Sequence, residues 1–177
     1  MLFTDLKPAP SLATSKWFNY AGPLSLRDLR GKVIVLYGFQ MLCPGCVSHC
    51  IPQARELHKH FAGNDVAVLG IHTVFEHHDA MGPTALKAFI EEYQLQFPIA
   101  VDAPSVSGHI PQTMEKYGMR GTPSVLLIDK SGNLRLHHYG HLPDLQLAKL
   151  INQLTNESQN TNVLQNDTKC DEQGCKI

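Results

Sequence analysis

The tetrapeptide Cys43-Pro44-Gly45-Cys46 constrains this chain more than any other feature, because of the two segments that it separates. The run from Val33 to Phe39 before it is apolar and aromatic throughout, which is typical of a strand buried on both faces. The apolar residues after it recur every three or four positions, which is typical of a helix with one apolar face. These residues are Val47, Ile51, Ala54, Leu57 and Phe61. We therefore expect the cysteines at a strand-to-helix junction, with Gly63-Asn64 ending the helix.

Pro52 is expected to kink this helix, because proline lacks an N–H and crowds the preceding turn. The elements predicted downstream are a strand over 66–71, a helix opening at Gly82-Pro83-Thr84, a strand over 97–101, a loop over 102–111, a helical turn over 113–117, two strands over 124–129 and 134–139 joined by a tight turn, and a last helix from Pro143. We place Leu145, Ala148, Leu150 and Ile151 on the inward side of the last helix. Helices that alternate with buried strands predict an α/β fold with a mixed sheet covered on both faces.

The length of 177 residues fits one compact domain with extensions, and a hydrophobic share of 43% suffices for a core. Residues 1–16 are expected to be extended, because Pro8 and Pro10 discourage helix. Beyond Thr155 the chain is polar with almost no apolar support. We therefore predict a domain over 1–153 and a flexible tail over 154–177 that carries Cys170 and Cys175.

Charge and hydropathy exclude two classes of partner. Fifteen basic and sixteen acidic side chains give a net charge of -1, with no basic stripe to follow a phosphate backbone, so we expect no nucleic-acid binding. The apolar runs are far shorter than the roughly 20 residues of a membrane span, so we expect no membrane insertion. The N-terminus lacks the pattern of a secretory signal, which favours the cytoplasm, or the periplasm if a signal has been removed.

The position of the cysteine pair favours redox chemistry. The start of a helix exposes unpaired N–H groups and carries about half a positive charge, which would stabilise a thiolate at Cys43. Cys46 lies one turn further along, within reach of a disulfide with Cys43. The sequence predicts an attacking thiol of low pKa near the surface and a sheltered resolving thiol. A passive disulfide or half of a zinc site is the alternative interpretation.

Three motifs follow one another along the chain. The segment over 25–35 leads into the cysteine pair, Gly118-Met119-Arg120-Gly121-Thr122-Pro123 follows about 75 residues later, and Leu127-Ile128-Asp129-Lys130-Ser131-Gly132 comes next. Together they resemble the thioredoxin-like family of the TlpA/ResA and AhpC/TSA (redoxin) type, over residues of about 15 to 153. The resemblance implies a thioredoxin fold with a central mixed sheet, helices on both faces and an N-terminal hairpin extension.

The resemblance also implies a thiol–disulfide oxidoreductase that needs no cofactor. Cys43 and Cys46 would be the catalytic pair, and the Thr122-Pro123 bond would be cis, packed beside them. The main chain of Thr122 would then pair with the bound substrate. The partners would be a protein disulfide and an unidentified thiol electron donor, and the absence of a secretory signal favours action as a reductase.

The chain departs from the family pattern at three positions. Gln40-Met41-Leu42 stands where the family usually has a Trp before the first cysteine. Tyr37 stands near the place of the buried acid of thioredoxin, so no carboxylate is available there as a proton relay. Gln40 also stands where the peroxiredoxin motif has a Thr, which disfavours direct peroxide reduction.

Three further residues are candidate modulators of the site. Glu76 is nearest to the position where related proteins place a glutamate after the next strand, and His72 at the end of that strand could tune the thiolate electrostatically. Cys50 lies one turn after Cys46 on the same helix face. It could fill the core, resolve a disulfide or bind a metal with Cys43, Cys46 and His49. Core filling is favoured, so we predict no metal site.

Two other functions stay open, namely a peroxide-handling antioxidant redoxin and a metal-binding thioredoxin-like module without turnover. The tail cysteines Cys170 and Cys175 are either functionally silent or act as an internal relay to the Cys43–Cys46 centre.

Overall fold

The computed structural model describes residues 2–3, 5–61 and 65–157. The predicted helix stop at Gly63-Asn64 and the predicted cysteine pair at Cys170 and Cys175 lie outside the described residues. The last described helix continues to Asn156, three residues past the predicted end of the domain.

Seven strands form one mixed sheet in the order β1-β7-β6-β3-β4-β5-β2. The strands are β1 (Lys7–Pro8), β2 (Thr14–Phe18), β3 (Val33–Phe39), β4 (Val66–His72), β5 (Ile99–Asp102), β6 (Ser124–Ile128) and β7 (Asn133–Tyr139). The pairs β3–β4 and β4–β5 are parallel, and the other pairs are antiparallel. The prediction of a mixed sheet is therefore confirmed.

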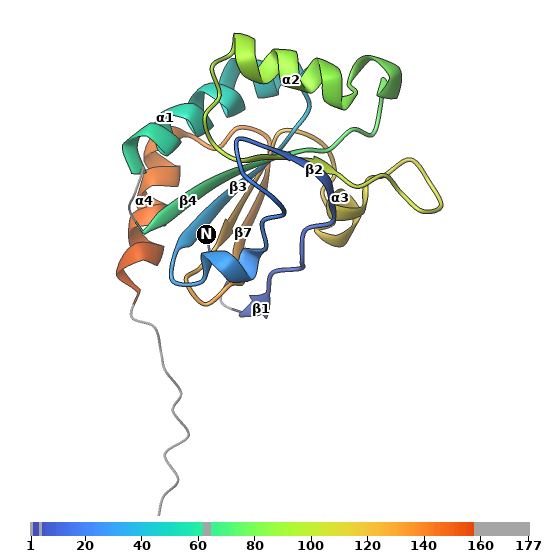
Figure 1. Ribbon diagram of the computed structural model, residues 1–177. Coiled ribbons are helices and arrows are strands. Elements are labelled where there is room, and N and C mark those ends of the chain that lie inside the picture. Colours follow the sequence, from blue (N-terminus) through green and yellow to red (C-terminus); the bar gives the residue numbers. More distant parts are fainter. Residues whose placement is uncertain (1, 4, 62–64, 158–177) are drawn as a thin grey trace, which may run out of the picture.

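Four α-helices and three shorter helical turns surround this sheet. The helices are α1 (Ile51–Phe61), α2 (Pro83–Glu92), α3 (Gln112–Lys116) and α4 (Asp144–Asn156), and the turns are two 3-10 helices, η1 (Leu26–Leu29) and η3 (His78–Ala80), and one π-helix, η2 (Cys46–Cys50). Figure 1 shows helices on both sides of the sheet. The predicted helix starts at Pro83 and after Pro143 are confirmed.

β3 is the central strand, and all seven of its residues are buried. Val35 and Tyr37 belong to one core cluster, in which β3 packs with α1, α2 and α4. Ile34 and Leu36 belong to a second cluster on the other face, with α3 and the N-terminal segment. Because successive side chains of a strand point to opposite faces, a strand that feeds two cores must be apolar throughout. The apolar run therefore correctly predicted a strand covered on both faces.

The predicted N-terminal hairpin is wrong, because β1 and β2 lie at opposite edges of the sheet. β1 pairs with β7, and β2 pairs with β5. The segment between them crosses the sheet on the side of α3, where the Tyr117 hydroxyl donates to the Pro10 carbonyl oxygen at 2.6 Å. The Thr113 hydroxyl likewise donates to the Ala13 carbonyl oxygen at 3.0 Å. These contacts hold the chain extended, so the two strands cap separate edges.

The inward face predicted for the last helix needs a correction as well. Leu150 and Ile151 are buried as expected, but Leu145 is 88% exposed and Ala148 is also exposed. Leu147 and Leu154 complete the buried stripe instead. The spacing of 147, 150, 151 and 154 follows the helical period better than a stripe that starts at 145.

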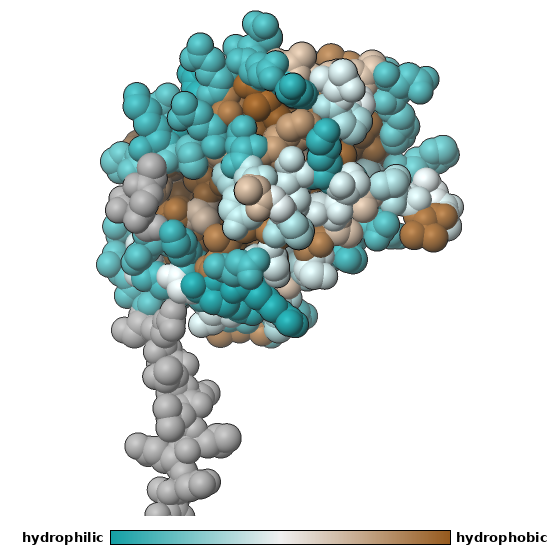
Figure 2. Space-filling view, viewed as in Figure 1, coloured by the Kyte–Doolittle hydropathy of each residue, from teal (hydrophilic) through white to brown (hydrophobic). Residues whose placement is uncertain are grey.

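The loop between β5 and α3, predicted over 102–111, projects from the body of the protein (Figure 1). Apolar side chains lie near its tip (Figure 2), and Val106 is 89% exposed. Over the rest of the face seen in Figure 2, hydrophilic residues surround smaller apolar areas. Among the described residues, every helix is too short or too polar to span a bilayer.

Candidate active site

A tight turn carries the chain from β3 to the cysteine pair. The Cys43 N–H donates to the Gln40 carbonyl oxygen at 3.2 Å, which closes the turn. Helical structure then begins at Pro44, and the Val47 N–H donates to the Cys43 carbonyl oxygen at 3.1 Å. Cys43 therefore caps a helix directly after a buried strand, as the sequence predicted.

The first turn of the helix after Gly45 is π-helical, over Cys46–Cys50, and α1 continues from it. The Ile51 N–H donates to the Cys46 carbonyl oxygen, which is the five-residue step of a π-helix. Pro52 follows at once and cannot donate a helical hydrogen bond, while its ring would crowd the carbonyl four residues earlier. The irregularity expected at Pro52 thus takes the form of a widened turn just before it, and this turn contains Cys46 and Cys50.

The three neighbouring cysteines differ in exposure. Cys43 is half-buried, whereas Cys46 and Cys50 are buried, and all three are free thiols. The Cys46 N–H donates to the Cys43 sulfur at 3.3 Å. An outer sulfur next to a sheltered one is the arrangement expected of an attacking and a resolving thiol. The burial of Cys50 agrees with its favoured interpretation as part of the core.

The lower pKa of the pair belongs to Cys46, although the sequence placed it at Cys43. A hydrogen bond from the Cys50 thiol lowers the pKa of Cys46 to about 6, against the effect of burial. Partial burial and then the hydrogen bond with Cys46 raise the pKa of Cys43. The hydrogen bond to Cys46, followed by burial, raises the pKa of Cys50 well above its ordinary value. The sulfurs of Cys43, Cys46 and Cys50 form a sulfur cluster that therefore holds one negative charge. The charge is centred on Cys46, because Cys46 has a thiol neighbour on each side.

The Thr122-Pro123 peptide bond is cis, which confirms the prediction. It lies directly before β6, and the Cys43 thiol donates to the Thr122 carbonyl oxygen at 3.5 Å. A Cβ atom added at Gly45 would lie 3.4 Å from the Pro123 ring. Two segments almost 80 residues apart in sequence therefore form the two walls around the Cys43 sulfur.

A cavity of about 610 Å³ opens beside Cys43. The residues that line it are Leu42, Cys43, Pro44, Phe75, Glu76, His77, Ala80, Arg120, Gly121, Thr122 and Tyr139. Leu42 and Tyr139 are more than half exposed at its rim, and the Arg120 guanidinium lies 5.8 Å from the centre of the Tyr139 ring. Glu76 is an exposed member of this lining, so the structure places it at the site. Sequence analysis assigned no role to Arg120, although it lies inside the motif at 118–123, and it missed Tyr139, which belongs to no motif.

In the core below β3's end, Tyr37 and Gln53 form a neutral hydrogen-bonded pair. The buried Tyr37 hydroxyl donates to Gln53 Oε1 at 2.9 Å. Burial raises the pKa of Tyr37 far above its usual range. The Gln53 amide in turn donates to the Leu142 carbonyl oxygen at 2.8 Å and to Asp144 Oδ1 at 2.6 Å. This network joins β3, α1 and the start of α4, and Gln53 is a member that sequence analysis did not identify.

His72 lies at the end of β4, next to the turn before Cys43. The side chain is 1% exposed, and burial lowers the pKa of His72 to about 4. The ring is therefore neutral at pH 7 and cannot tune a thiolate through a positive charge. Its Nε2 instead accepts a hydrogen bond from the Met41 N–H at 3.4 Å.

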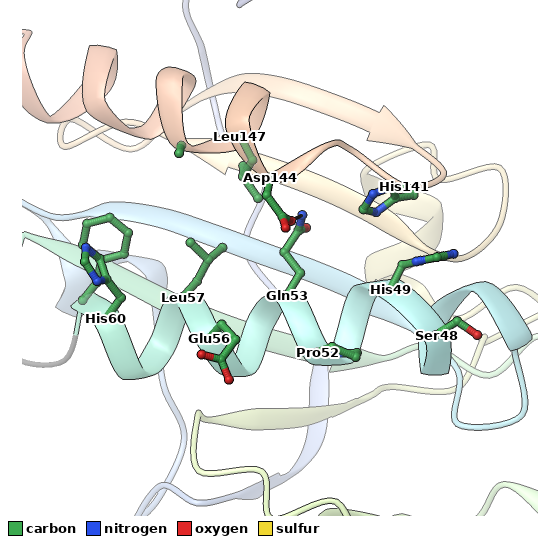
Figure 3. A pocket seen from close by; sticks show the side chains of 12 residues that line it. Ser48, His49, Pro52, Gln53, Glu56, Leu57, His60, His141, Asp144 and Leu147 are labelled. Carbon is green, nitrogen blue, oxygen red and sulfur yellow. Dashed lines mark hydrogen bonds between the residues drawn. The ribbon is translucent and has the colours of Figure 1, made fainter.

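A second cavity of about 610 Å³ lies between α1 and α4. Figure 3 shows Gln53 of α1 and Asp144 of α4 pointing toward each other across it, with His49 and His141 at one end. The centres of those two imidazole rings are 4.8 Å apart. Cys43 does not line this cavity, so we place the chemistry at the cavity beside the cis-proline. Within the part of the chain that the structure describes, no group of three or more His, Cys, Asp or Glu could hold a metal ion.

Comparison with known proteins identifies relatives of the same architecture. The AhpC/TSA family model matches residues 7–137. The crystal structure of a thioredoxin-like superfamily protein is 56% identical, with a TM-score of 0.83 over 85% of this chain and 97% of that one. A thiol-disulfide isomerase from Corynebacterium glutamicum is 48% identical, with a TM-score of 0.81 over 85% of this chain and 98% of that one.

Curated relatives are more distant. The thiol-disulfide oxidoreductase ResA of Bacillus thuringiensis subsp. konkukian is 28% identical over 133 residues, which cover 75% of this chain and 69% of ResA. NHL repeat-containing protein 2 of Gallus gallus is 27% identical over 122 residues. That match covers 67% of this chain but spans only 16% of the length of the chicken protein.

Proposed function

The chain belongs to the AhpC/TSA family and is a redox enzyme related to thiol–disulfide oxidoreductases, and from this premise we propose that it reduces protein disulfides with Cys43 and Cys46. The observation that carries the proposal is the contrast between the two sulfurs. Cys43 is half-buried in the wall of an open cavity, and Cys46 is buried directly behind it. Among the described thiols, the half-buried position of Cys43 supports it as the one that meets a partner, and the position of Cys46 behind it supports Cys46 as the resolving thiol.

The reaction consists of two thiol–disulfide exchanges. The Cys43 sulfur attacks one sulfur of the partner disulfide, a new S–S bond joins Cys43 to the partner, and the other partner sulfur leaves as a thiolate that takes up a proton. Cys46 then attacks the Cys43 sulfur and closes the Cys43–Cys46 disulfide, which releases the second partner thiol. Two electrons and two protons pass to the partner, and a dithiol donor returns the enzyme to its reduced form.

The sulfur cluster can supply the thiolate for the first step. The charge centred on Cys46 is adjacent to the Cys43 thiol, so a proton that moves from Cys43 to Cys46 creates the nucleophile at the exposed position. The Thr122 carbonyl oxygen and the Cys46 N–H both contact the Cys43 sulfur and fix its direction. Pre-orientation of this kind removes much of the entropy cost of the attack.

The pKa of the pair supports action as a reductase. A thiolate that is strongly stabilised makes the reduced form more stable and the enzyme more oxidising. Partial burial raises the pKa of the attacking Cys43 thiol, whereas the attacking thiol of the oxidant DsbA has a pKa of about 3.5. We therefore propose a reduction potential nearer to the thioredoxin value of about −270 mV than to the DsbA value of about −120 mV.

The cavity beside Cys43 supports an extended protein segment as the substrate. Phe75, Leu42 and Tyr139 offer apolar surface, and Arg120 and Glu76 offer charge of both signs. The cavity is open, partly apolar and close to the main chain of Thr122. It therefore suits a segment of the substrate polypeptide next to the substrate's disulfide.

The test pairs two single substitutions in an insulin-disulfide reduction assay. Cys46→Ser should stop turnover but accumulate a mixed disulfide between Cys43 and the substrate, visible by mass spectrometry. Cys43→Ser should stop turnover and accumulate none. A Cys46→Ser protein that captures no substrate would contradict the proposed roles. Consumption of hydrogen peroxide without insulin reduction would favour an antioxidant redoxin instead, and the reduction potential of the wild-type pair decides the direction.

A further inference from the structure

The turn from Gln40 to Cys43 supplies backbone hydrogen bonds to both cysteines of the pair. A hydrogen bond from the Gln40 backbone lowers the pKa of Cys46, and the Gln40 carbonyl oxygen accepts from the Cys43 N–H. Met41 lies between them and is 7% exposed, so its N–H has little access to bulk water. The orientation of this turn therefore contributes to the stabilisation of a thiolate on Cys46.

One side chain from another strand contacts the backbone of this turn. His72 ends β4, which pairs in parallel with β3 so that His72 lies opposite Phe39, the last residue of β3. The Phe39 and His72 rings pack with their centres 5.3 Å apart. At this position Nε2 of His72 lies 3.4 Å from the Met41 nitrogen, where it accepts the Met41 N–H.

This hydrogen bond also assigns the tautomer of the ring. An Nε2 that accepts a hydrogen bond carries no proton, so the neutral ring must carry its hydrogen on Nδ1. Nδ1 is buried and has no hydrogen-bond partner among the residues that the structure describes. His72 lines a cavity of about 360 Å³ whose other titratable groups are His78, His109 and Asp102.

We propose that His72 is a positioning residue for the redox pair, because its unprotonated Nε2 holds the Met41 N–H and so fixes the turn whose backbone hydrogen-bonds to both cysteines. The proposal rests on the proposed function of Cys43 and Cys46. His72 touches neither sulfur nor substrate, so it acts through the Gln40–Cys43 turn. When the acceptor is lost, the Met41 N–H is left buried and unpaired, and the turn relaxes away from the geometry that stabilises the thiolate.

Two substitutions distinguish the two ring nitrogens. In His72→Gln the amide oxygen reaches the position of Nε2, so the acceptor for Met41 is kept. In His72→Asn the shorter amide reaches only the position of Nδ1, so the acceptor is lost while a polar side chain of similar size remains. A residue that only fills space would respond similarly to both changes.

The measurement is the absorbance of the thiolate at 240 nm in the reduced protein as a function of pH. We expect His72→Asn to raise the apparent thiolate pKa by about one unit, which means about tenfold less thiolate at pH values below it. His72→Gln should titrate like the wild type. The proposal is overturned if His72→Asn titrates like the wild type, or if His72→Gln shifts as far as His72→Asn.

A measurement on the wild type covers the case in which a variant does not fold. The ¹⁵N chemical shifts of the His72 ring should show a protonated Nδ1 and an unprotonated Nε2 at pH 7, and a protonated Nε2 would overturn the assignment. Neither titration nor tautomer requires turnover. A wild-type protein that fails to reduce insulin would therefore contradict the proposed function while leaving the role of His72 to be decided separately.

Discussion

The two ends of the central strands treat buried polar groups differently. At the end where β6 turns into β7, Asp129 accepts hydrogen bonds from Asn133 and from Arg135, and Arg135 also pairs with Glu157. At the opposite end, where β3 and β4 finish, three buried polar atoms have no partner among the described residues. They are Gln40 Nε2, His72 Nδ1 and Thr73 Oγ1.

This difference follows from what each end does. A buried polar group without a partner costs free energy, so folded proteins keep few of them and concentrate them where function requires it. The end where β6 turns into β7, called the hairpin end below, is built for stability. Its Asp129 carboxylate accepts hydrogen bonds from the turn and from Arg135. The sulfur end, where β3 and β4 finish beside Cys43, keeps buried polar atoms that no described residue satisfies. The predictions below test this division.

The largest effect is expected when the outer sulfur is removed. Cys43→Ser should lower the rate of insulin reduction by several orders of magnitude, because no other exposed thiol faces the cavity in the described structure. Its free energy of unfolding should stay close to that of the reduced wild type, since Cys43 is only half-buried. A Cys43→Ser variant with substantial remaining activity would place the nucleophile elsewhere.

At the hairpin end we expect a substitution to lower stability and leave activity unchanged. Arg135→Met should lower the free energy of unfolding by about 1–3 kcal/mol, because it leaves the largely buried Asp129 carboxylate without its cationic partner. Lys130→Met is the matched control, since its partner Asp65 is 72% exposed and such a pair contributes less than about 1 kcal/mol. Urea unfolding measures both. The division between the ends would be wrong if Arg135→Met changed activity per folded molecule.

The pH dependence of the sulfur end should follow the thiolate. Below the pKa of about 6 for Cys46, the rate at which iodoacetamide alkylates the reduced protein should rise about tenfold per pH unit, and it should level off above that pKa. The rate rises with pH because alkylation requires a deprotonated sulfur. Arg135→Met should leave this profile unchanged, and a midpoint near 8.5, the value of a free cysteine, would exclude a stabilised thiolate.

The smallest effect is expected from the third cysteine. Cys50→Ala removes the thiol that donates to Cys46, so the pKa of Cys46 should rise and alkylation at pH 6 should slow about threefold. Cys50→Ser keeps a donor at the same place and should slow the reaction less. Equal rates in Cys50→Ala and wild type would show that Cys50 only fills space.

Local pattern predicted most of the elements because it reports burial directly. The apolar run from Val33 to Phe39 and the helical spacing after Cys46 each depend on neighbours within one element, and both match the structure. The predicted inward face of the last helix was wrong at Leu145, which is exposed. Several leucines of this helix fit an apolar stripe, and the spacing alone does not show which of them meets the core. The N-terminal strands failed for the same reason, since an extended segment does not encode the sheet edge with which it pairs.

The site shows the same limit. Cys43 and Cys46 are three residues apart, so the sequence could identify them. Arg120, Tyr139 and Gln53 reach the site only because the chain returns to it from other elements. The order of the pKa values within the pair also depended on Cys50, whose thiol contacts Cys46 only in the geometry of the π-helical turn.

The sequence by itself determined most of the strands and helices, the thiol pair at a strand-to-helix junction and the family resemblance that places a cis-proline in the fold. These features depend on side-chain period and on motifs of a few residues, which need no knowledge of distant contacts. Only the tertiary structure decided which of ten histidines holds the turn before Cys43 and which sulfur holds the charge. Both depend on atoms that meet through packing and on the removal of water around them, and neither is written in local spacing.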